Sequence, residues 1–299
     1  MDAISVDVIQ ASLVRVAVVV LMVSLGLRVP ASAIVAAARH GRAFVLTVFL
    51  ALVVVPVVAW ATVRVLGLPE PVAVGILLIA AAPGGSLGLK LVDLARGDVA
   101  LGLGLFFGLA LIAPFSVPIT AAVLVGTGSS GLAVDAVPLI VTLLAIQVVP
   151  LAVALVVARV APRPARRIGR LATTATTILL VGLIAVALVI NLDETLAIGA
   201  SGVVAYLVII ATALVGGLVL ARDRPGVEPA VGPAVGFLSA QRSASLALLI
   251  ATSMNVPAVT GAVVAGGLIL LVVNPVVARL LAVRRPEPLT NRPEVARIG

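Results

Sequence analysis

Two basic residues lie in parts of this sequence that are otherwise almost wholly apolar. Lys90 closes the stretch Ala-Pro-Gly-Gly-Ser-Leu-Gly-Leu-Lys at 82–90. Arg242 stands in the middle of Ser-Ala-Gln-Arg-Ser-Ala-Ser at 239–245. A cation within an apolar segment is a candidate functional residue, and the hydroxyl and amide groups around these two cations can also bind oxyanions. The chemistry that these residues could perform is recognition of an anion.

Both cations follow or occupy an interruption in a long apolar run. Pro83-Gly84-Gly85 breaks the first run, and polar residues break the second near its middle. A helix interrupted in a membrane frees backbone groups that lipid cannot satisfy, and the start of its second half, at Ser86 to Gly88, offers N–H donors to an anion. A simple kink that lets helices pack closely is the alternative. The matching second interruption, with Arg242, favours a binding site.

The candidate ligand-binding residues are Pro83, Gly84, Gly85, Ser86, Gly88, Lys90, Ser239, Gln241, Arg242 and Ser243. Arg242 lies 18 positions after Arg224, too deep to extend easily to the membrane surface. Lys90 precedes Arg96 by only six residues, roughly 9 Å along a helix. Lys90 could therefore extend to the surface or pair with Asp93, and structural and functional interpretations of it stay equally open.

The composition is that of a membrane protein. The chain is 62% hydrophobic and 11% charged, with a mean hydropathy of +1.33, whereas soluble domains carry about 25% charged residues. There is no cysteine, so disulfides, thiolate metal sites and a cysteine nucleophile are excluded. The single histidine, His40, stands in a basic loop and is interpreted as a solvated residue. No bound metal or other cofactor is expected.

Nine apolar segments are long enough to be spanning helices, which need roughly 20 residues each. They are 8–27, 43–66, 71–95, 98–126, 135–160, 169–191, 196–221, 230–253 and 257–283. Strand-type alternation is absent, so we predict an all-α polytopic membrane protein. Asp2 and Asp7 precede the first segment where a signal peptide would carry lysines, so this segment is interpreted as a mature helix.

The net charge of +8 comes from arginines in short gaps between apolar segments, which favours a topology signal over nucleic-acid binding. They occupy alternate gaps: Arg28, Arg39 and Arg42; Arg96; Arg159, Arg163, Arg166, Arg167 and Arg170; Arg222 and Arg224; Arg279, Arg284, Arg285, Arg292 and Arg297. Arg64 is nearly alone on the opposite side. We expect a multi-pass protein of the inner membrane, with the N-terminus outside and a basic cytoplasmic tail at 284–299; contact with anionic lipid is a secondary expectation.

The two interrupted segments occupy corresponding positions in the two halves of the chain. Each begins with the tripeptide Ala-Val-Gly, at 73–75 and at 234–236, and each precedes a long apolar helix. Corresponding interruptions are typical of transporters built from inverted repeats, whose ligand site lies where the interruptions meet. The sequence therefore predicts one transmembrane domain, 1–283, with a first repeat at about 8–126 and a second at about 135–283.

These motifs resemble the bile acid:sodium symporter family. The resemblance rests on the following stretches: Leu25-Gly-Leu-Arg-Val-Pro30, Val55-Pro56, Leu68-Pro-Glu-Pro-Val-Ala-Val-Gly75, Pro83-Gly-Gly-Ser86, Leu94-Ala-Arg-Gly-Asp-Val-Ala-Leu101 and, less closely, Ala240-Gln-Arg-Ser243. It implies ten helices in two inverted five-helix repeats, with a panel domain and a core domain that cross at two broken helices. The stretch before the first segment is too short for the first of these ten helices, so the chain resembles the nine-helix version of the family.

The same resemblance implies sodium sites whose ligands this chain lacks. The positions of the family's Ser-Asn pair fall at Gly88 and Leu89, and those of its glutamate and glutamine ligands at Leu238 and Arg242. A further glutamine position falls near Ala51. Sodium requires oxygen ligands, so coupling to sodium is disfavoured, and Lys90 and Arg242 could stand as fixed charges in place of two bound cations.

The sequence thus predicts a secondary transporter of small organic anions, such as bile acids or other carboxylates, that works by alternating access. A non-transporting receptor or sensor that retains the anion site is the alternative. An arsenite exporter is disfavoured without cysteine, and a cation/proton antiporter without a mid-membrane acid. An enzyme is also disfavoured, because the sequence shows no pairing of a nucleophile with a base. The sequence leaves open the substrate, the direction, the oligomeric state, and whether transport is uniport, exchange or proton-linked, for which Asp93 is the nearest candidate.

Overall fold

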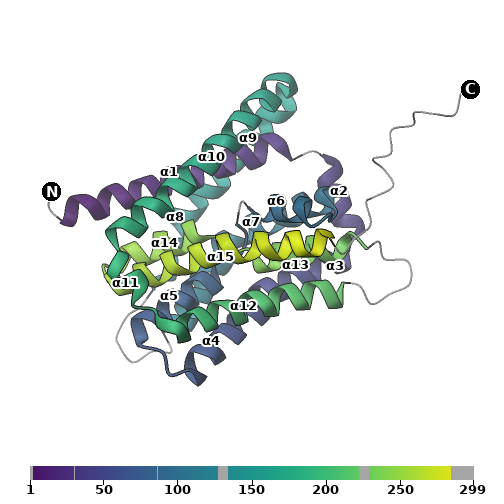
Figure 1. The fold of residues 1–299 in the computed structure, drawn as a ribbon. Helices are drawn as coiled ribbons and strands as arrows, with labels where there is room; N and C mark the ends of the chain where they lie inside the picture. Colours follow the sequence, from purple (N-terminus) through teal and green to yellow (C-terminus); the bar gives the residue numbers. More distant parts are fainter. Residues whose placement is uncertain (1–2, 30, 86, 127–133, 222–228, 284–299) are drawn as a thin grey trace, which may run out of the picture.

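The computed structural model of the protein is an elongated bundle of helices (Figure 1). It describes residues 3–29, 31–85, 87–126, 134–221 and 229–283. Six helices among these residues are long and apolar enough to cross a bilayer, so the protein is a polytopic α-helical membrane protein. The six are Gly41–Val65, α7 (Val99–Val125), Ala136–Val160, α10 (Pro162–Ile190), α12 (Gly199–Leu220) and α15 (Pro257–Val283).

Of the other three predicted segments, one lies in a single helix and two are each divided into two helices. The segment at 8–27 lies within α1 (Ala3–Arg28). The segment at 71–95 is divided into α5 (Glu70–Ala81) and α6 (Gly88–Leu94). The segment at 230–253 is divided into α13 (Val231–Ala240) and α14 (Ala244–Ser253). Both segments that the sequence marks as interrupted are therefore pairs of half-helices. The predicted basic tail, 284–299, lies outside the described residues.

The structure corrects several predicted boundaries. The segment predicted to begin at 169 begins at Pro162 in α10, so its arginines are helical and do not form a loop. Proline suits the first turn of a helix and arginine is a good helix former, so α10 extends beyond its apolar part. Two regions predicted as gaps contain α2 (Ala31–Arg39) and α11 (Leu192–Leu196). His40 is a turn residue between α2 and α3 (Gly41–Phe49), as predicted for a loop residue.

Two of the long helices contain a π-helical turn. The turn η1 (Leu50–Val54) joins α3 to α4 (Val55–Val65), and η2 (Leu144–Val148) joins α8 (Ala136–Leu143) to α9 (Val149–Val160). The sequences share one frame, Leu-Ala-Leu-Val-Val-Val-Pro at 50–56 and Leu-Ala-Ile-Gln-Val-Val-Pro at 144–150. Each proline lacks the N–H that would continue the helical hydrogen bonds, and the wider turn accommodates this loss. Such turns are frequent at functional sites.

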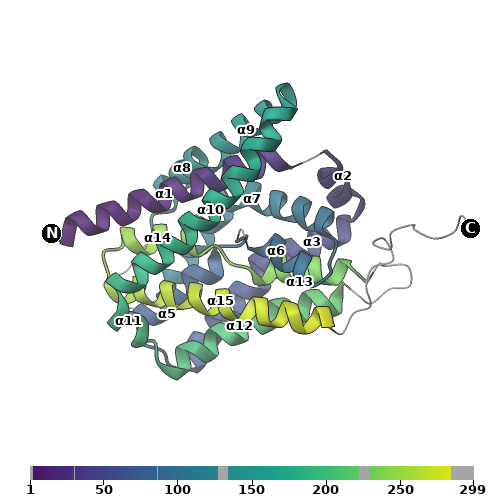
Figure 2. The ribbon, with the colours of Figure 1, turned by 45° about the horizontal axis from the view of Figure 1, so that its top comes forward.

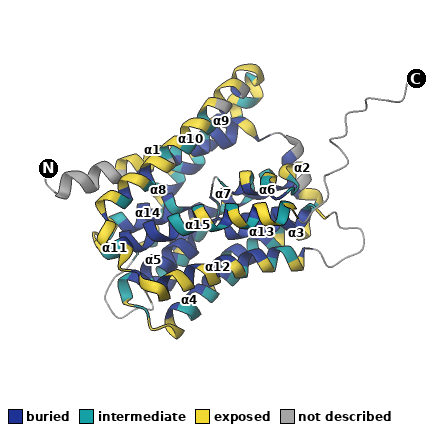
Figure 3. Ribbon diagram, viewed as in Figure 1, coloured by how far each residue is buried: buried dark blue, intermediate teal, exposed yellow. Residues whose placement is uncertain are grey.

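The helices form two groups that meet along one boundary. The smaller helix group consists of α1, α8–η2–α9 and α10, with α1 packed along α9 and α10 (Figures 1 and 2). The larger helix group consists of α3–η1–α4, α5 to α7 and α12 to α15. At the boundary α1 contacts α14, α7 contacts α8, and α10 contacts α15. The outward faces of the helices are the exposed ones (Figure 3), and many of the residues exposed there are large and apolar, as expected for helices in lipid.

Candidate functional site

The two interruptions meet and pair within the larger helix group. Pro83 lies opposite Arg242 in a single antiparallel β-bridge. The Gly84 N–H donates to the Gln241 carbonyl at 3.2 Å, and the Ser243 N–H donates to the Ala82 carbonyl at 2.8 Å. These two hydrogen bonds satisfy backbone groups that the helix ends leave free and that lipid could not satisfy. The predicted candidate residues of both interruptions are thereby brought to one place, which we call the crossover.

Proline and glycine suit the crossover for separate reasons. The 83/242 pair is the type in which neither residue contributes to the flanking hydrogen bonds, so Pro83 forfeits nothing by lacking an N–H. Gly84 has a φ of 83°, a conformation that a side chain disfavours. A Cβ at Gly85 would lie 2.7 Å from the Arg242 carbonyl oxygen and from Gln241. The sequence motif is therefore explained by backbone geometry at the pairing point.

Arg242 is the most deeply placed charge at the crossover. Its side chain is 1% exposed, and Nη2 donates to the Ala51 carbonyl at 2.8 Å, in the π-turn η1. Among the described residues, Nε and Nη1 have no hydrogen-bond partner. Burying a cation costs several kcal/mol unless hydrogen bonds and a counter-charge offset the cost. The guanidinium therefore retains donors for an additional acceptor.

Gln241 is held by a residue that the sequence analysis did not select. The Asn274 Nδ2 group in α15 donates to Gln241 Oε1 at 2.9 Å, and Asn274 is fully buried. Gln241 Nε2 makes a long contact of 3.5 Å with the Arg242 carbonyl. The sequence feature that could have indicated Asn274 is its position as a lone asparagine before Pro275 in the apolar segment 257–283. The amide of Asn274 orients that of Gln241.

Ser243 and Ser239 differ in their surroundings. Ser243 Oγ accepts from the Leu246 N–H at 3.4 Å and so caps α14, and it also lies 3.2 Å from Ser245 Oγ. An N-cap hydroxyl satisfies one of the free N–H groups of a helix. Ser239 is fully buried, and its hydroxyl has no partner within the described part of the chain. Ser243 thus has a structural role, whereas Ser239 retains hydrogen-bonding capacity.

A second unselected residue, Gln147, approaches the crossover from the smaller helix group. It lies in the π-turn η2, is 1% exposed, and its Nε2 has no partner among the described residues. With Pro83, Gly84 and Ser243 it lines a cavity of about 10 Å³, room for about one water molecule. The sequence feature that could have indicated Gln147 is its position as a polar residue three places before Pro150 in an apolar segment. The two π-turns thus present polar groups to the crossover from both helix groups.

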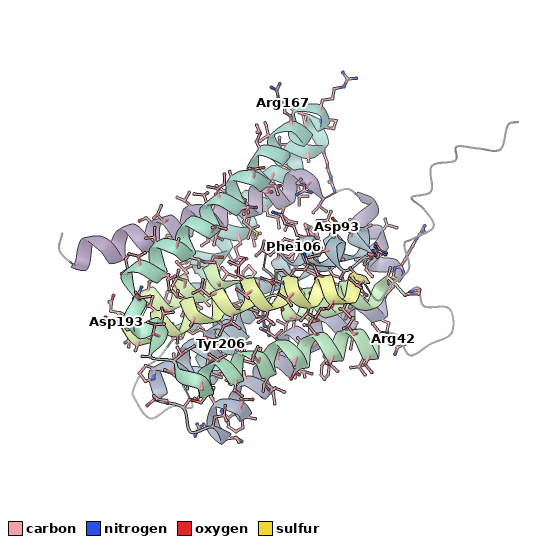
Figure 4. All side chains as sticks on the ribbon, viewed as in Figure 1. Arg42, Asp93, Phe106, Arg167, Asp193 and Tyr206 are labelled. Atoms are coloured by element: carbon pink, nitrogen blue, oxygen red, sulfur yellow. The ribbon has the colours of Figure 1, made fainter. Side chains whose placement is uncertain are left out.

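A cavity of about 60 Å³ lies beside the crossover on the boundary between the groups. Gly85, Gln241, Arg242 and Ser243 line it from the larger group. Its other side is mostly apolar and includes Leu21, Thr177 and the α10 residues that follow. Phe106 of α7, in the interior of the bundle, packs near Gly84 (Figure 4). The cavity offers a polar, cationic wall and an apolar wall, as an amphiphilic anion would require.

The remaining predicted site residues lie apart from this cavity. Gly88 is buried at the start of α6, close to Gln241 but outside the cavity lining. Lys90 is exposed, and its Nζ donates to Thr177 Oγ1 of α10 at 3.2 Å. The structure therefore does not bring Lys90 to Arg242. Ser86 lies outside the described residues.

Comparison with protein families identifies a match. The family model described as the Sodium Bile acid symporter family matches residues 15–198, more than half of the chain. No curated protein matches the chain. The matched region begins within α1 and extends through α11; it includes the first interruption and both π-turns, and it ends before the second interruption.

Proposed function

Because the chain belongs to the sodium bile acid symporter family, we propose that it is a secondary transporter of small organic anions, such as bile acids or other carboxylates. In this proposal it crosses the inner membrane nine times, with the N-terminus outside and the C-terminus in the cytoplasm. Asp193 and Arg42, which fall in gaps of opposite predicted sidedness, lie at opposite ends of the bundle (Figure 4). This separation supports the proposed orientation.

The two helix groups correspond in this proposal to the panel and core domains of an inverted-repeat transporter. Three cavities are lined by residues of both groups and so lie along their boundary. A cavity of about 510 Å³ lies at the end lined by Arg15, Asp135 and Ser253, the 60 Å³ cavity lies at the crossover, and one of about 40 Å³ lies near Lys90. Motion of one group against the other would open the crossover to each side in turn, which is alternating access.

The observation that carries the proposal is the buried guanidinium of Arg242, whose Nε and Nη1 lack partners among the described residues. A carboxylate in the adjacent cavity would supply both a counter-charge and hydrogen-bond acceptors. Ser243, which caps α14, places the N-terminal end of that helix beside the same cavity, and its dipole adds to the attraction for an anion. The apolar wall of the cavity suits the hydrocarbon part of the ligand.

Sodium fits this site poorly. The positions that the family resemblance assigns to sodium ligands hold Leu238, which is fully buried, and Gly88 and Leu89, whose side chains carry no oxygen. The Ala51 carbonyl, at the position of a further glutamine ligand, accepts a hydrogen bond from Arg242. A fixed guanidinium in place of a bound cation explains this arrangement, because it supplies the positive charge that anion binding requires. We therefore propose transport without sodium coupling.

Uptake into proteoliposomes tests the proposal. The purified protein is reconstituted, and uptake of radiolabelled taurocholate and of smaller carboxylates is measured with a sodium gradient, with potassium replacing sodium, and with Arg242→Gln as the control variant. We expect protein-dependent uptake that is equal in both salts and is lost in Arg242→Gln. Accumulation that requires sodium would overturn the fixed-charge proposal. Ligand that binds without entering the vesicles would overturn transport and favour a receptor.

A further inference from the structure

A second cationic cluster lies on the boundary between the helix groups, away from the crossover. Arg28 ends α1 in the smaller group, and Lys90 lies on α6 in the larger group. Both line the cavity of about 40 Å³, together with Ser24 and three threonines of α10, Thr173, Thr176 and Thr177. The described lining residues include two cations and no carboxylate. Two like charges are thus brought together where the groups meet.

Neutral hydroxyl groups are the partners that the structure gives these cations. Arg28 Nη1 donates to Thr173 Oγ1 at 2.9 Å, and Lys90 Nζ donates to Thr177 Oγ1 at 3.2 Å. Both threonine hydroxyls in turn donate to carbonyls one turn earlier in α10, to Gly169 at 2.8 Å and Thr173 at 3.0 Å. The hydroxyl hydrogens are therefore committed, and their oxygens orient the cations without neutralising them.

Both cations keep unused donors. An ammonium group has three N–H donors and a guanidinium has five, and the recorded hydrogen bonds use one of each. A water needs about 10–15 Å³ of such space, so 40 Å³ has room for about three water-sized groups, enough for the oxygens that a carboxylate or a phosphate group presents to donors. Donor capacity, charge and volume thus all match a small oxyanion.

We propose that Arg28 and Lys90 together bind an oxyanion, a carboxylate or phosphate group, in this cavity. A bound oxyanion would bridge α1 and α6, and so would hold the two helix groups together at this end. Without the anion the two positive charges repel each other. The cavity is distinct from that of Arg242 but adjoins it, because Leu21 and Thr177 line both. A transported anion would therefore meet it before or after the crossover, a consequence that alone rests on the proposed transport function.

The absence of cysteine from the sequence makes the potential in this cavity directly measurable. Leu89 lines the cavity, is partly buried and has no hydrogen-bonding role, so Leu89→Cys provides one reactive thiol. The protein is placed in phosphatidylcholine nanodiscs. Rates of labelling by an anionic sulfonatoethyl methanethiosulfonate and by its cationic trimethylammonium analogue are then compared.

Lys90→Gln and Arg28→Gln are expected to slow the anionic reagent and to accelerate the cationic one, each by about fivefold for a charge roughly 4 Å away in water-like surroundings. Arg279→Gln is the matched control, because this exposed arginine of α15 loses the same charge outside the cavity. Labelling rates that do not change, or that change equally in Arg279→Gln, would overturn the proposal.

Protection experiments distinguish the source of the oxyanion. Slower labelling in the presence of benzoate indicates a soluble carboxylate, whereas slower labelling only in phosphatidylglycerol nanodiscs indicates a lipid phosphate. In either case the double variant Arg28→Gln/Lys90→Gln should remove the protection. Failure of both probes to protect would contradict oxyanion binding. The assay requires no transport, so its result is independent of the uptake experiment.

Discussion

The two interrupted helices differ in what they contribute to the crossover. In the second, α13 and α14 have ten residues each, α13 is wholly buried, and the residue between them that pairs with Pro83 is the buried Arg242. In the first, α5 has twelve residues, but α6 has only seven, and it carries the exposed Lys90. The first interruption contributes a tight backbone turn, and the second contributes the same pairing together with a buried charge.

This difference places the two cations at different depths, which sets how much each of them needs a partner within the protein. A lysine at the exposed face keeps its hydration and can make hydrogen bonds without any ligand. A buried arginine loses its hydration, and the loss is offset only by partners within the site. Since the guanidinium of Arg242 makes one hydrogen bond within the described part of the chain, to the Ala51 carbonyl, its burial favours a role in ligand binding. The following substitutions test that distinction.

The largest effect is expected from Gly85→Ala. The added Cβ would approach the Arg242 carbonyl and the Gln241 side chain to 2.7 Å, so the paired backbones must separate. We expect a loss of about 1–3 kcal/mol of stability, typical of overpacking, and loss of uptake. Thermal unfolding and proteoliposome uptake measure both. Gly182→Ala is the control, because no described atom beyond the backbone of its own helix lies within 4 Å of a Cβ there; equal effects of the two variants would contradict close packing at the crossover.

Arg242→Gln is expected to lower the affinity for a carboxylate without lowering the stability of the fold. Loss of hydrogen bonds from a charged group costs about 1.5–3 kcal/mol, so the affinity for a carboxylate should fall roughly 10- to 100-fold. The thermal stability should be unchanged or higher, because a buried charge is removed. Equilibrium binding and thermal unfolding are measured on the same preparation. Unchanged affinity with a lower melting temperature would make Arg242 structural.

Asn274→Ala tests whether the amide pair orients Gln241. The substitution leaves Gln241 Oε1 buried without a donor, which costs about 1–3 kcal/mol. The double variant Asn274→Leu/Gln241→Leu removes both partners and should be considerably more stable than Asn274→Ala. A double-mutant cycle by thermal unfolding gives the coupling between the two residues. Additive effects would show that their hydrogen bond contributes nothing.

The smallest effect is expected from Lys90→Gln. An exposed side chain away from packed features changes stability by less than about 0.5 kcal/mol. Because Lys90 does not line the crossover cavity, carboxylate affinity there should fall less than about fivefold, in contrast to Arg242→Gln. The same binding assay compares the two variants. A loss as large as that of Arg242→Gln would place both cations in one site and would remove the distinction between the interruptions.

Much of the helix arrangement could be predicted from the pattern of apolar residues. The last segment, 257–283, has the bounds of α15, and both breaks fall where proline, glycine and polar residues interrupt the apolar runs. The start of α10 was predicted wrongly, because hydropathy locates the lipid-facing part of a helix and not its helical continuation into arginine-rich sequence. Gln147 and Asn274 were missed because single polar residues in apolar segments do not reveal which way they face.

The sequence by itself determined that the chain is a polytopic helical membrane protein and that two of its apolar segments are broken. It did so because lipid imposes apolar length and because proline and glycine end helices locally. Only the tertiary structure decided that Pro83 pairs with Arg242, that the Ala51 carbonyl receives the guanidinium, and that Lys90 lies apart with Arg28. Those relations join residues distant in the chain, and they depend on how the helices pack against one another, which no local pattern records.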